Sequence, residues 1–398
     1  FQTLCDLLHR GLKLMVFKKR RHVGKHMASN RCCLRFCFLG LVILSVCSVA
    51  YIMTRGYFLL YVNPGVEKMD YYTLIDEKRE ERDGFEEKDI SKTTCKRDKF
   101  EDILLVIAFV ELLHDSIPYL EELYRKHFPN IIYCFPVKPT ENLEHTFLVV
   151  EMLHGVTAYE CLSTAMRTKP GFTGYLFMRN DLFLNIWSIA DFNTSRIWKS
   201  ADQLGNQVMF QQPRGSWIWW YTPWGLKACE QAFKDVIYLN DAYRRSIIDN
   251  TVQEDSWDVE NSLNALLWNG RGINMCYRCF SSLFYVPNEY ASAFEKLSVV
   301  FHKNQVYMDI AVPTIIRMLD LIEKAEILPG LNLGLLYGEE RAQNDGQLLL
   351  RHLTTNISYI RPVELRPQSD LTEPRTAGLF DKLLDHLRRF NYSGCSIT

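Results

Sequence analysis

Acidic residues are almost absent from the first 35 positions, and charge of either sign is absent from the segment that follows. Residues 1–35 carry nine lysines and arginines but only one acid, Asp6, and no charged residue occurs from 36 to 53. This apolar run has the length of a membrane-spanning helix, which we place at residues 36–54. Since basic segments resist translocation, residues 1–35 are predicted to form a cytoplasmic tail of a single-pass type II membrane protein.

A cleaved signal peptide is the alternative to this anchor. The apolar run is too long for the core of a signal peptide, and no small-residue cleavage pattern follows it. The sequence therefore favours a retained anchor, with the rest of the chain on the lumenal side. The polar, charge-dense residues 55–97 are typical of a stem, and residues 98–398 are expected to form a lumenal globular domain.

The chain beyond Arg55 also lacks an excess of basic residues. It contains 36 lysines and arginines against 46 aspartates and glutamates. Nucleic acids attract proteins with clustered positive charge, so this balance excludes a nucleic-acid partner. No internal repeat is present, and no low-complexity tract occurs outside the stem.

Cysteines are sparse and odd in number beyond the anchor. Seven occur there, so in an oxidising compartment at least one must be free or pair between chains. Cys276 and Cys279 have the spacing of a zinc or redox motif, but no second pair accompanies them. A structural disulfide or two buried thiols is the favoured interpretation of this motif. Three sequons also lie beyond the anchor, and we predict glycosylation at Asn193, Asn356 and Asn391.

Strand-like and helix-like segments alternate at the start of the lumenal domain. Apolar runs predict strands at 103–110, 130–137, 146–152 and 174–178, and helical patterns lie at 116–127, with Ser116 as N-cap, and at 157–167. This order predicts an α/β fold with a Rossmann-like, mostly parallel sheet flanked by helices.

The fourth of these strands leads into the polar residues Arg179, Asn180 and Asp181. Ligands of open parallel sheets bind beyond the carboxyl ends of the strands, and a carboxylate there is suited to a hard divalent cation. Such a cation, manganese or magnesium, would neutralise a diphosphate leaving group. The alternative is an ordinary strand-to-helix turn in which Asp181 is a helix N-cap.

This segment resembles the acidic motif of STELLO-like, Golgi-resident glycosyltransferase-like proteins, which usually reads GYL-x-x-x-DD-x-x-x-N-x-W. The residues that match are Gly174, Tyr175, Leu176, Asp181, Asn185 and Trp187. The likeness continues at 127–131, 159–166, 217–220, 284–287 and 306–314. The resemblance implies a GT-A-type fold at the Golgi membrane and sugar transfer from a nucleotide-sugar to a glycan acceptor. It also implies a divalent metal held by Asp181 with help from Asn180.

Two departures from the family pattern point to an alternative. Asn180 stands where the first aspartate of the motif is expected, and Arg361 and Glu364 stand where relatives read His and Lys. These changes favour, as the second hypothesis, a catalytically inactive scaffold that organises other Golgi enzymes. A cell-surface receptor ectodomain is disfavoured by the parallel strand–helix order, because such ectodomains are usually β-sandwiches.

Asp309 and a tryptophan cluster are the remaining candidates. Asp309 lies in an apolar stretch, where desolvation would raise its pKa and suit it to act as a general base; the alternative is a buried carboxylate bonded to backbone donors or capping a helix. Trp217, Trp219 and Trp220 would stack on sugar rings or serve core packing. Alternation as in a strand would turn the first two one way and Trp220 the other. His127 and His302 have no partner at ligand spacing and are expected to be structural.

Overall fold

The computed structural model describes nine stretches of the chain: residues 100–110, 114–139, 146–202, 205–248, 259–338, 346–353, 356–363, 365 and 379–389. The predicted tail, transmembrane helix and stem lie outside these stretches, as do Glu364 and Asn391. Among the helices that are described, none is both long enough and apolar enough to cross a membrane.

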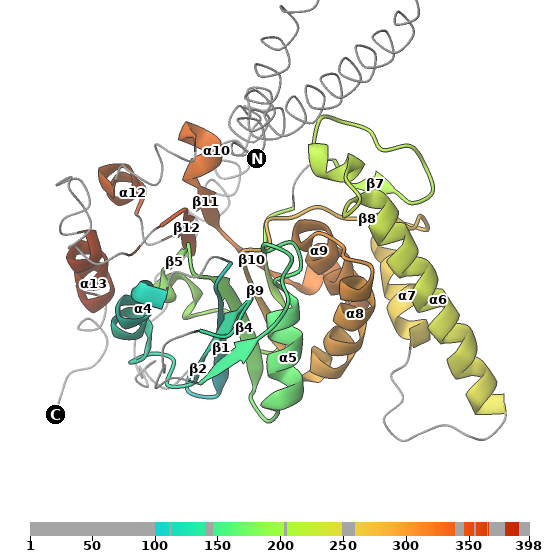
Figure 1. Cartoon of the computed structure of the whole chain (residues 1–398), viewed down its shortest axis with the longest axis horizontal. Coiled ribbons are helices and arrows are strands. Elements are labelled where there is room, and N and C mark those ends of the chain that lie inside the picture. Colours follow the sequence, from blue (N-terminus) through green and yellow to red (C-terminus); the bar gives the residue numbers. More distant parts are fainter. Residues whose placement is uncertain are drawn as a thin grey trace, which may run out of the picture. The chain divides into compact units, whose positions relative to one another are not determined.

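The described chain is a mixed α/β structure built on a seven-stranded sheet (Figure 1). The strand order is β10-β6-β9-β4-β1-β2-β3, and only β9 runs against its neighbours. The strands are β1 (Ile103–Ala108), β2 (Ile131–Phe135), β3 (Phe147–Val149), β4 (Gly174–Arg179), β6 (Trp198–Ser200), β9 (Leu283–Pro287) and β10 (Glu326–Leu328). The prediction of a mostly parallel sheet flanked by helices is confirmed.

Both faces of this sheet are covered, which explains the continuous apolar runs in the sequence. In β1, Leu104 and Val106 belong to one buried cluster, whereas Ile103, Leu105 and Ile107 belong to the other. Alternate side chains of a strand point to opposite faces, so a strand with both faces covered must be apolar throughout.

Helices fill the two faces unequally. One cluster contains side chains of α5 (Glu160–Thr168), α8 (Ala291–Lys303) and α9 (Met308–Leu319), with α6 (Leu226–Ile248) and α7 (Val259–Asn269) packed beside them. The other cluster includes side chains of α4 (Ile117–Tyr124), α10 (Leu333–Tyr337), α12 (Gly346–His352) and α13 (Leu379–Arg389). Figure 1 shows α5 alongside the parallel strands, and α4 next to α13.

Two smaller sheets complete the described structure. In the first, β12 (Tyr359–Arg361) lies between β11 (Gly330–Asn332) and β5 (Phe183–Leu184). This sheet brings the late segment that carries Arg361 beside the residues that follow β4. The second sheet pairs β7 (Gln207–Val208) with β8 (Met275–Cys276).

The early elements agree with the predicted ones, with ends displaced by a few residues. Strands β1 to β4 fall inside or close to the four predicted ranges, and α4 and α5 match the two predicted helices. Pro118 lies in the first turn of α4, as expected. Ser116 occupies the N-cap position of α4 as predicted, but its side chain makes no capping hydrogen bond to the helix.

The cysteines divide into two disulfides and one buried thiol among the described residues. Cys134 pairs with Cys161, and Cys229 pairs with Cys276. Cys279 is a free, buried thiol, and burial raises its pKa to about 12. Of the two favoured interpretations of the Cys276–Cys279 motif, the structural disulfide holds for Cys276, which pairs with Cys229, and the pair of buried thiols is wrong because only Cys279 is a thiol.

Candidate active site

The carboxyl ends of β1 and β4 define a topological switch point of the sheet. The chain passes from β1 outward to β2 and β3, and then returns to form β4 on the other side of β1. At such points the connections diverge and leave a crevice for ligands. The Asn180 backbone N–H donates to the Ala108 carbonyl oxygen over 3.0 Å, which fixes the residues after β4 at this end of the sheet.

Asp181 is held there by two arginines. Arg179 donates from Nε and Nη2 to the two carboxylate oxygens of Asp181 at 3.0 and 3.1 Å. Arg361 Nη2 donates to Oδ2 at 3.1 Å. Burial alone would raise the pKa of Asp181, but the two guanidinium groups outweigh burial and hold the pKa below its usual value. The carboxylate is therefore ionised and already paired with two positive charges.

Arg361 reaches this position through the smaller sheet. Strand β12 pairs antiparallel with β5, and the Val363 backbone N–H donates to the Asp181 carbonyl oxygen at 2.9 Å. The Arg361 side chain is only 14% exposed. The hydrogen bond between Arg361 and Asp181 thus connects residues that are 180 positions apart in the sequence.

Asp309 lies in the first turn of α9 and is buried. Its Oδ1 accepts from the Ser281 backbone N–H at 2.8 Å, and its Oδ2 accepts from the Tyr307 hydroxyl at 3.2 Å. Burial raises the pKa of Asp309, while these two donors and the charges of Arg361 and Arg179 oppose the rise. The expected elevation of the pKa is present, and so is the bond to a backbone donor that the structural alternative predicted.

Two serines at the start of β9 connect the two carboxylates. Ser281 donates to Asp309, and the Ser282 hydroxyl accepts from Arg361 Nη1 at 3.1 Å. The Ser282 carbonyl also accepts from the Arg179 backbone N–H at 3.0 Å. The predicted residues Asp181 and Asp309, which are far apart in sequence, are thus linked through Arg361 and the two serines, and the charges of both arginines also act on Asp309.

The tryptophan cluster adjoins Asp309 through Tyr307. The Trp219 ring stacks on the Tyr307 ring with centroids 4.1 Å apart and planes inclined by 11°. Trp217 lies 6.0 Å from the Tyr307 ring, and the Arg278 guanidinium lies 4.2 Å from the Trp217 ring centroid. Trp217 and Trp219 are half-buried, so part of each ring faces solvent, whereas Trp220 is buried in the core.

Trp220 does differ in burial from Trp217 and Trp219, but these residues do not form the predicted strand. Residues Ile218–Tyr221 form a 3-10 helix, and Trp217 precedes it in an extended conformation. Trp220 is buried because the tight turn directs it inward, where it packs against Trp217. A Cβ at Gly225 would lie 2.0 Å from the Trp219 carbonyl oxygen, so the close return of the chain beneath this turn requires glycine.

A second ion cluster lies at the carboxyl end of β6. Asp202 accepts from Lys199 Nζ at 2.8 Å and also pairs with Arg317. The Lys199 and Arg317 side chains are 2% and 3% exposed, so both cations depend on Asp202 for compensation. Asp202 forms a β-bridge with Cys279, two residues before Ser281, which places this cluster beside the first site.

We expect Asp202→Ala to lower the free energy of unfolding by about 3 kcal/mol, since two buried cations would lose their counter-ion. This is the low end of the usual range because the Asp202 side chain is 38% exposed. Burial alone would raise the pKa of Asp202, but Arg317 and Lys199 lower it below its usual value. The stabilisation is therefore present at neutral pH and is lost only as the pH falls through that lowered pKa. Urea unfolding at pH 7 measures the change, and Asp191→Ala, at an exposed position, is the control.

The residues around Asp181 do not form a set of ligands suited to a divalent cation. Its carboxylate oxygens accept from two guanidinium groups, and the neighbouring Asn180 offers only an amide. No group of three His, Cys, Asp or Glu side chains with metal-binding geometry occurs in the described part of the chain. A cation at Asp181 would have to displace two positive charges, which electrostatics opposes.

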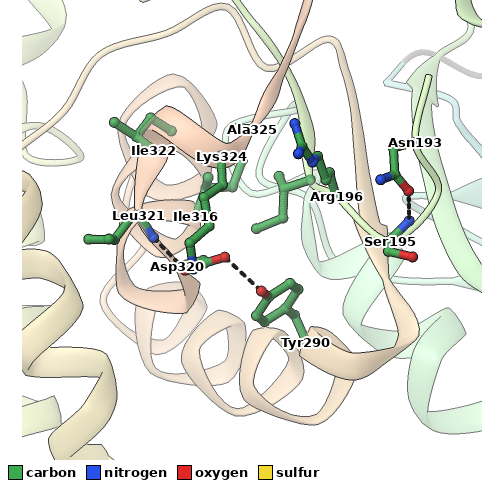
Figure 2. Close-up of a pocket in the computed structure, with 11 residues that line it drawn as sticks. Asn193, Ser195, Arg196, Tyr290, Ile316, Asp320, Leu321, Ile322, Lys324 and Ala325 are labelled. Carbon is green, nitrogen blue, oxygen red and sulfur yellow. Dashed lines mark hydrogen bonds and ion pairs between the residues drawn. The ribbon is translucent and has the colours of Figure 1, made fainter.

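One pocket lies at the opposite end of the sheet, where β6 and β10 begin. It has a volume of about 270 Å³ and is lined by residues that precede β6 and by residues that follow α9 (Figure 2). Asp320 at its wall accepts from the Tyr290 hydroxyl at 2.8 Å. Neither Asp181 nor Asp309 lines this pocket, so its volume plays no part in the candidate active site.

Two of the three predicted glycosylation sites are described, and both asparagines are exposed. Asn193 lies at the rim of the pocket in Figure 2, and its Oδ1 accepts from the Ser195 backbone N–H at 2.9 Å. Asn356 is exposed immediately before β12, although Ser358 of the same sequon is buried.

Sequence reasoning missed several residues of the site. Arg179 lies two positions before Asp181, and Tyr307 lies two positions before Asp309. Their closeness in sequence to the two candidate carboxylates is the signal that could have identified them. No local signal distinguishes Ser281, Ser282 or the second ion cluster, because their roles depend on long-range pairing. Comparison with models of known protein families finds none that matches this chain, and a search among curated proteins finds no match either.

Proposed function

We propose that this chain is a glycosyltransferase-like, single-pass type II protein of the Golgi membrane that transfers a sugar from a nucleotide-sugar to a glycan acceptor. One observation carries the proposal. A buried carboxylate with a raised pKa, Asp309, lies within the field of the two arginines that pair with Asp181 at the switch point of a mostly parallel sheet. Perturbed carboxylates beside cationic groups at such a crevice are typical of catalytic sites.

The sheet supports a GT-A-type assignment within this proposal. The parallel order β3-β2-β1-β4 is a Rossmann-like half, and the sheet continues through the reversed strand β9 to β6 and β10. The Asn180–Asp181 turn lies at the end of β4, where the two halves join. In the family that the sequence resembles, the acidic motif is expected at this position.

In the reaction we propose, Asp309 acts on the acceptor. Its carboxylate takes the proton of an acceptor hydroxyl, the oxygen of that hydroxyl forms the new bond to the anomeric carbon, and the bond from that carbon to the diphosphate breaks. The developing charge on the departing diphosphate is balanced by positive groups at the site. The exposed parts of Trp217 and Trp219 provide a flat apolar surface for the acceptor sugar rings.

Two features support the lumenal location. Disulfides persist in oxidising compartments and are rare in the cytosol, and the described residues contain two. The asparagines of two sequons are exposed and accessible to a glycosylating enzyme. Both agree with the predicted type II topology, in which the whole domain is lumenal.

The second candidate is a catalytically inactive scaffold that organises other Golgi enzymes. It is favoured by the pairing of Asp181 with two arginines, which occupies the carboxylate that the family motif would use for metal. The two candidates differ in their binding of donor. The scaffold predicts no binding of uridine or guanosine diphosphate sugars by calorimetry, and crosslinked partner enzymes instead.

The direct test uses the full chain purified in detergent with a panel of uridine and guanosine diphosphate sugars. We expect release of nucleoside diphosphate from at least one donor, and faster release when a glycan acceptor is added. Absence of both turnover and binding across the panel, with the protein folded by circular dichroism, would reject the enzymatic proposal in favour of the scaffold.

Tyr307→Phe is expected to move the acid limb of the pH–rate profile to higher pH. Asp309 must be ionised to accept a proton, so activity falls as the pH drops through its raised pKa. The Tyr307 hydroxyl favours the ionised form, and its removal raises that pKa further, while the Phe ring keeps the stacking on Trp219. Tyr290→Phe, which removes a hydroxyl bonded to Asp320 instead, is the matched control and leaves the limb in place. An unchanged profile in Tyr307→Phe would show that Asp309 is not the titrating base.

A further inference from the structure

Basic side chains outnumber carboxylates in the two described ion clusters beside Asp309. Asp181 is paired with two arginines, and Asp202 is paired with Lys199 and Arg317. Together with Asp309, these clusters contain four basic side chains and three carboxylates. A divalent cation would add to this excess, whereas an anion would neutralise it.

Arg179 and Arg361 have the chemistry to bind a diphosphate. A guanidinium group presents a planar set of N–H donors that matches phosphate oxygens in pairs, and it stays ionised when partly buried. Their side chains are 21% and 14% exposed, so their charge is less screened by water than on an open surface. Both converge on Asp181, which holds them in one orientation before any ligand arrives.

We propose that Arg179 and Arg361 bind the diphosphate of the donor without a divalent cation, and that Asp181 is their counter-ion rather than a metal ligand. An entering diphosphate replaces the Asp181 carboxylate as the partner of the guanidinium groups. The two guanidinium groups thereby supply the positive charge that a divalent cation would otherwise bring to the diphosphate. The inference rests on the proposed function for the identity of the donor.

The test is a calorimetric titration of the full chain in detergent with inorganic pyrophosphate, in EDTA and in manganese chloride. We expect binding in EDTA that manganese does not strengthen. Arg361→Gln should weaken it at least tenfold, and Arg361→Lys should weaken it less, because lysine keeps the charge but not the paired donors. Arg167→Gln, which removes an exposed arginine paired with Glu295, is the matched control and should leave binding unchanged.

Asp181→Asn gives results of opposite sign under the two models. If Asp181 is a counter-ion, its neutralisation frees both arginines and raises the pyrophosphate affinity several-fold in EDTA. If Asp181 is a metal ligand, wild-type binding requires manganese, and Asp181→Asn abolishes that binding. The second pattern would overturn the inference. Thermal unfolding of each variant identifies any that fails to fold, and Arg361→Lys then decides the question.

Failure of this inference is distinguishable from failure of the proposed function. Sugar transfer that occurs only with manganese would reject the arginine site and keep the enzyme. Pyrophosphate binding in EDTA without turnover of any donor would keep the arginine site and reject catalysis. An absence of pyrophosphate binding in both EDTA and manganese rejects the diphosphate site itself.

Discussion

An Asp309→Asn variant is expected to lose between about 10²- and 10⁴-fold in the rate of sugar transfer, the usual contribution of a general base. Asn preserves the size of the side chain and an oxygen that accepts from the Ser281 backbone N–H. It cannot take a proton from an acceptor hydroxyl. Donor binding should change little, because the proposed diphosphate partners, Arg179 and Arg361, are untouched. A fall in kcat with an unchanged donor KM is therefore the expected signature.

Asp320→Asn is the matched control for this prediction. Asp320 follows α9, whereas Asp309 lies in its first turn, and Asp320 bonds to the Tyr290 hydroxyl and to Lys324 at the opposite end of the sheet. It should retain transfer within about twofold of the unaltered chain, since Asp320 bonds to none of the residues proposed to act on donor or acceptor. If Asp309→Asn transferred sugar as fast as this control, Asp309 would be only a structural carboxylate that ties residue 281 to α9.

Removal of the Cys229–Cys276 disulfide is expected to lower the free energy of unfolding by about 4 kcal/mol, from the loop-closure entropy of its length. The two cysteines are 47 positions apart and join α6 to β8. Cys276 is also followed closely by Arg278 and Ser281, which contact Trp217 and Asp309. Urea unfolding of the Cys229→Ser/Cys276→Ser variant measures the loss, and calorimetry with donor shows whether the site loosens with it.

Cys279→Ala is the control for the disulfide. Its thiol is buried but makes no disulfide, so its loss should cost about 1 kcal/mol, the value for one small buried group. The Cys134→Ser/Cys161→Ser variant, with a separation of 27 positions, should lose slightly less than the longer loop. Equal stability of the Cys229→Ser/Cys276→Ser variant and Cys279→Ala would mean that the Cys229–Cys276 disulfide does not form in the mature protein.

Much of the fold could be predicted from the sequence because its signals are local. The run Ile103–Ala108 is apolar throughout, which is what a strand buried on both faces requires, and the strand–helix alternation that follows implies parallel pairing. Ser116 shows how far local signals reach, because it occupies the predicted N-cap position but its side chain makes no capping hydrogen bond. The aromatic segment Trp217–Tyr221 is a second example, since its sequence fits both the predicted strand and the 3-10 helix that the structure shows.

The sequence by itself determined the α/β class, the parallel start of the sheet and the position of Asp181 at a strand end, since each depends on the periodicity of neighbouring residues. The predicted anchor and stem also rest on the sequence alone. Only the tertiary structure decided the electrostatic character of the site. Arg361 lies 180 positions from Asp181, and it meets that carboxylate only because β12 pairs with β5. The sequence motif suggested that Asp181 binds a metal ion, but in the folded chain this carboxylate lies between two arginines. Charges far apart in sequence come within hydrogen-bonding distance only in the folded chain.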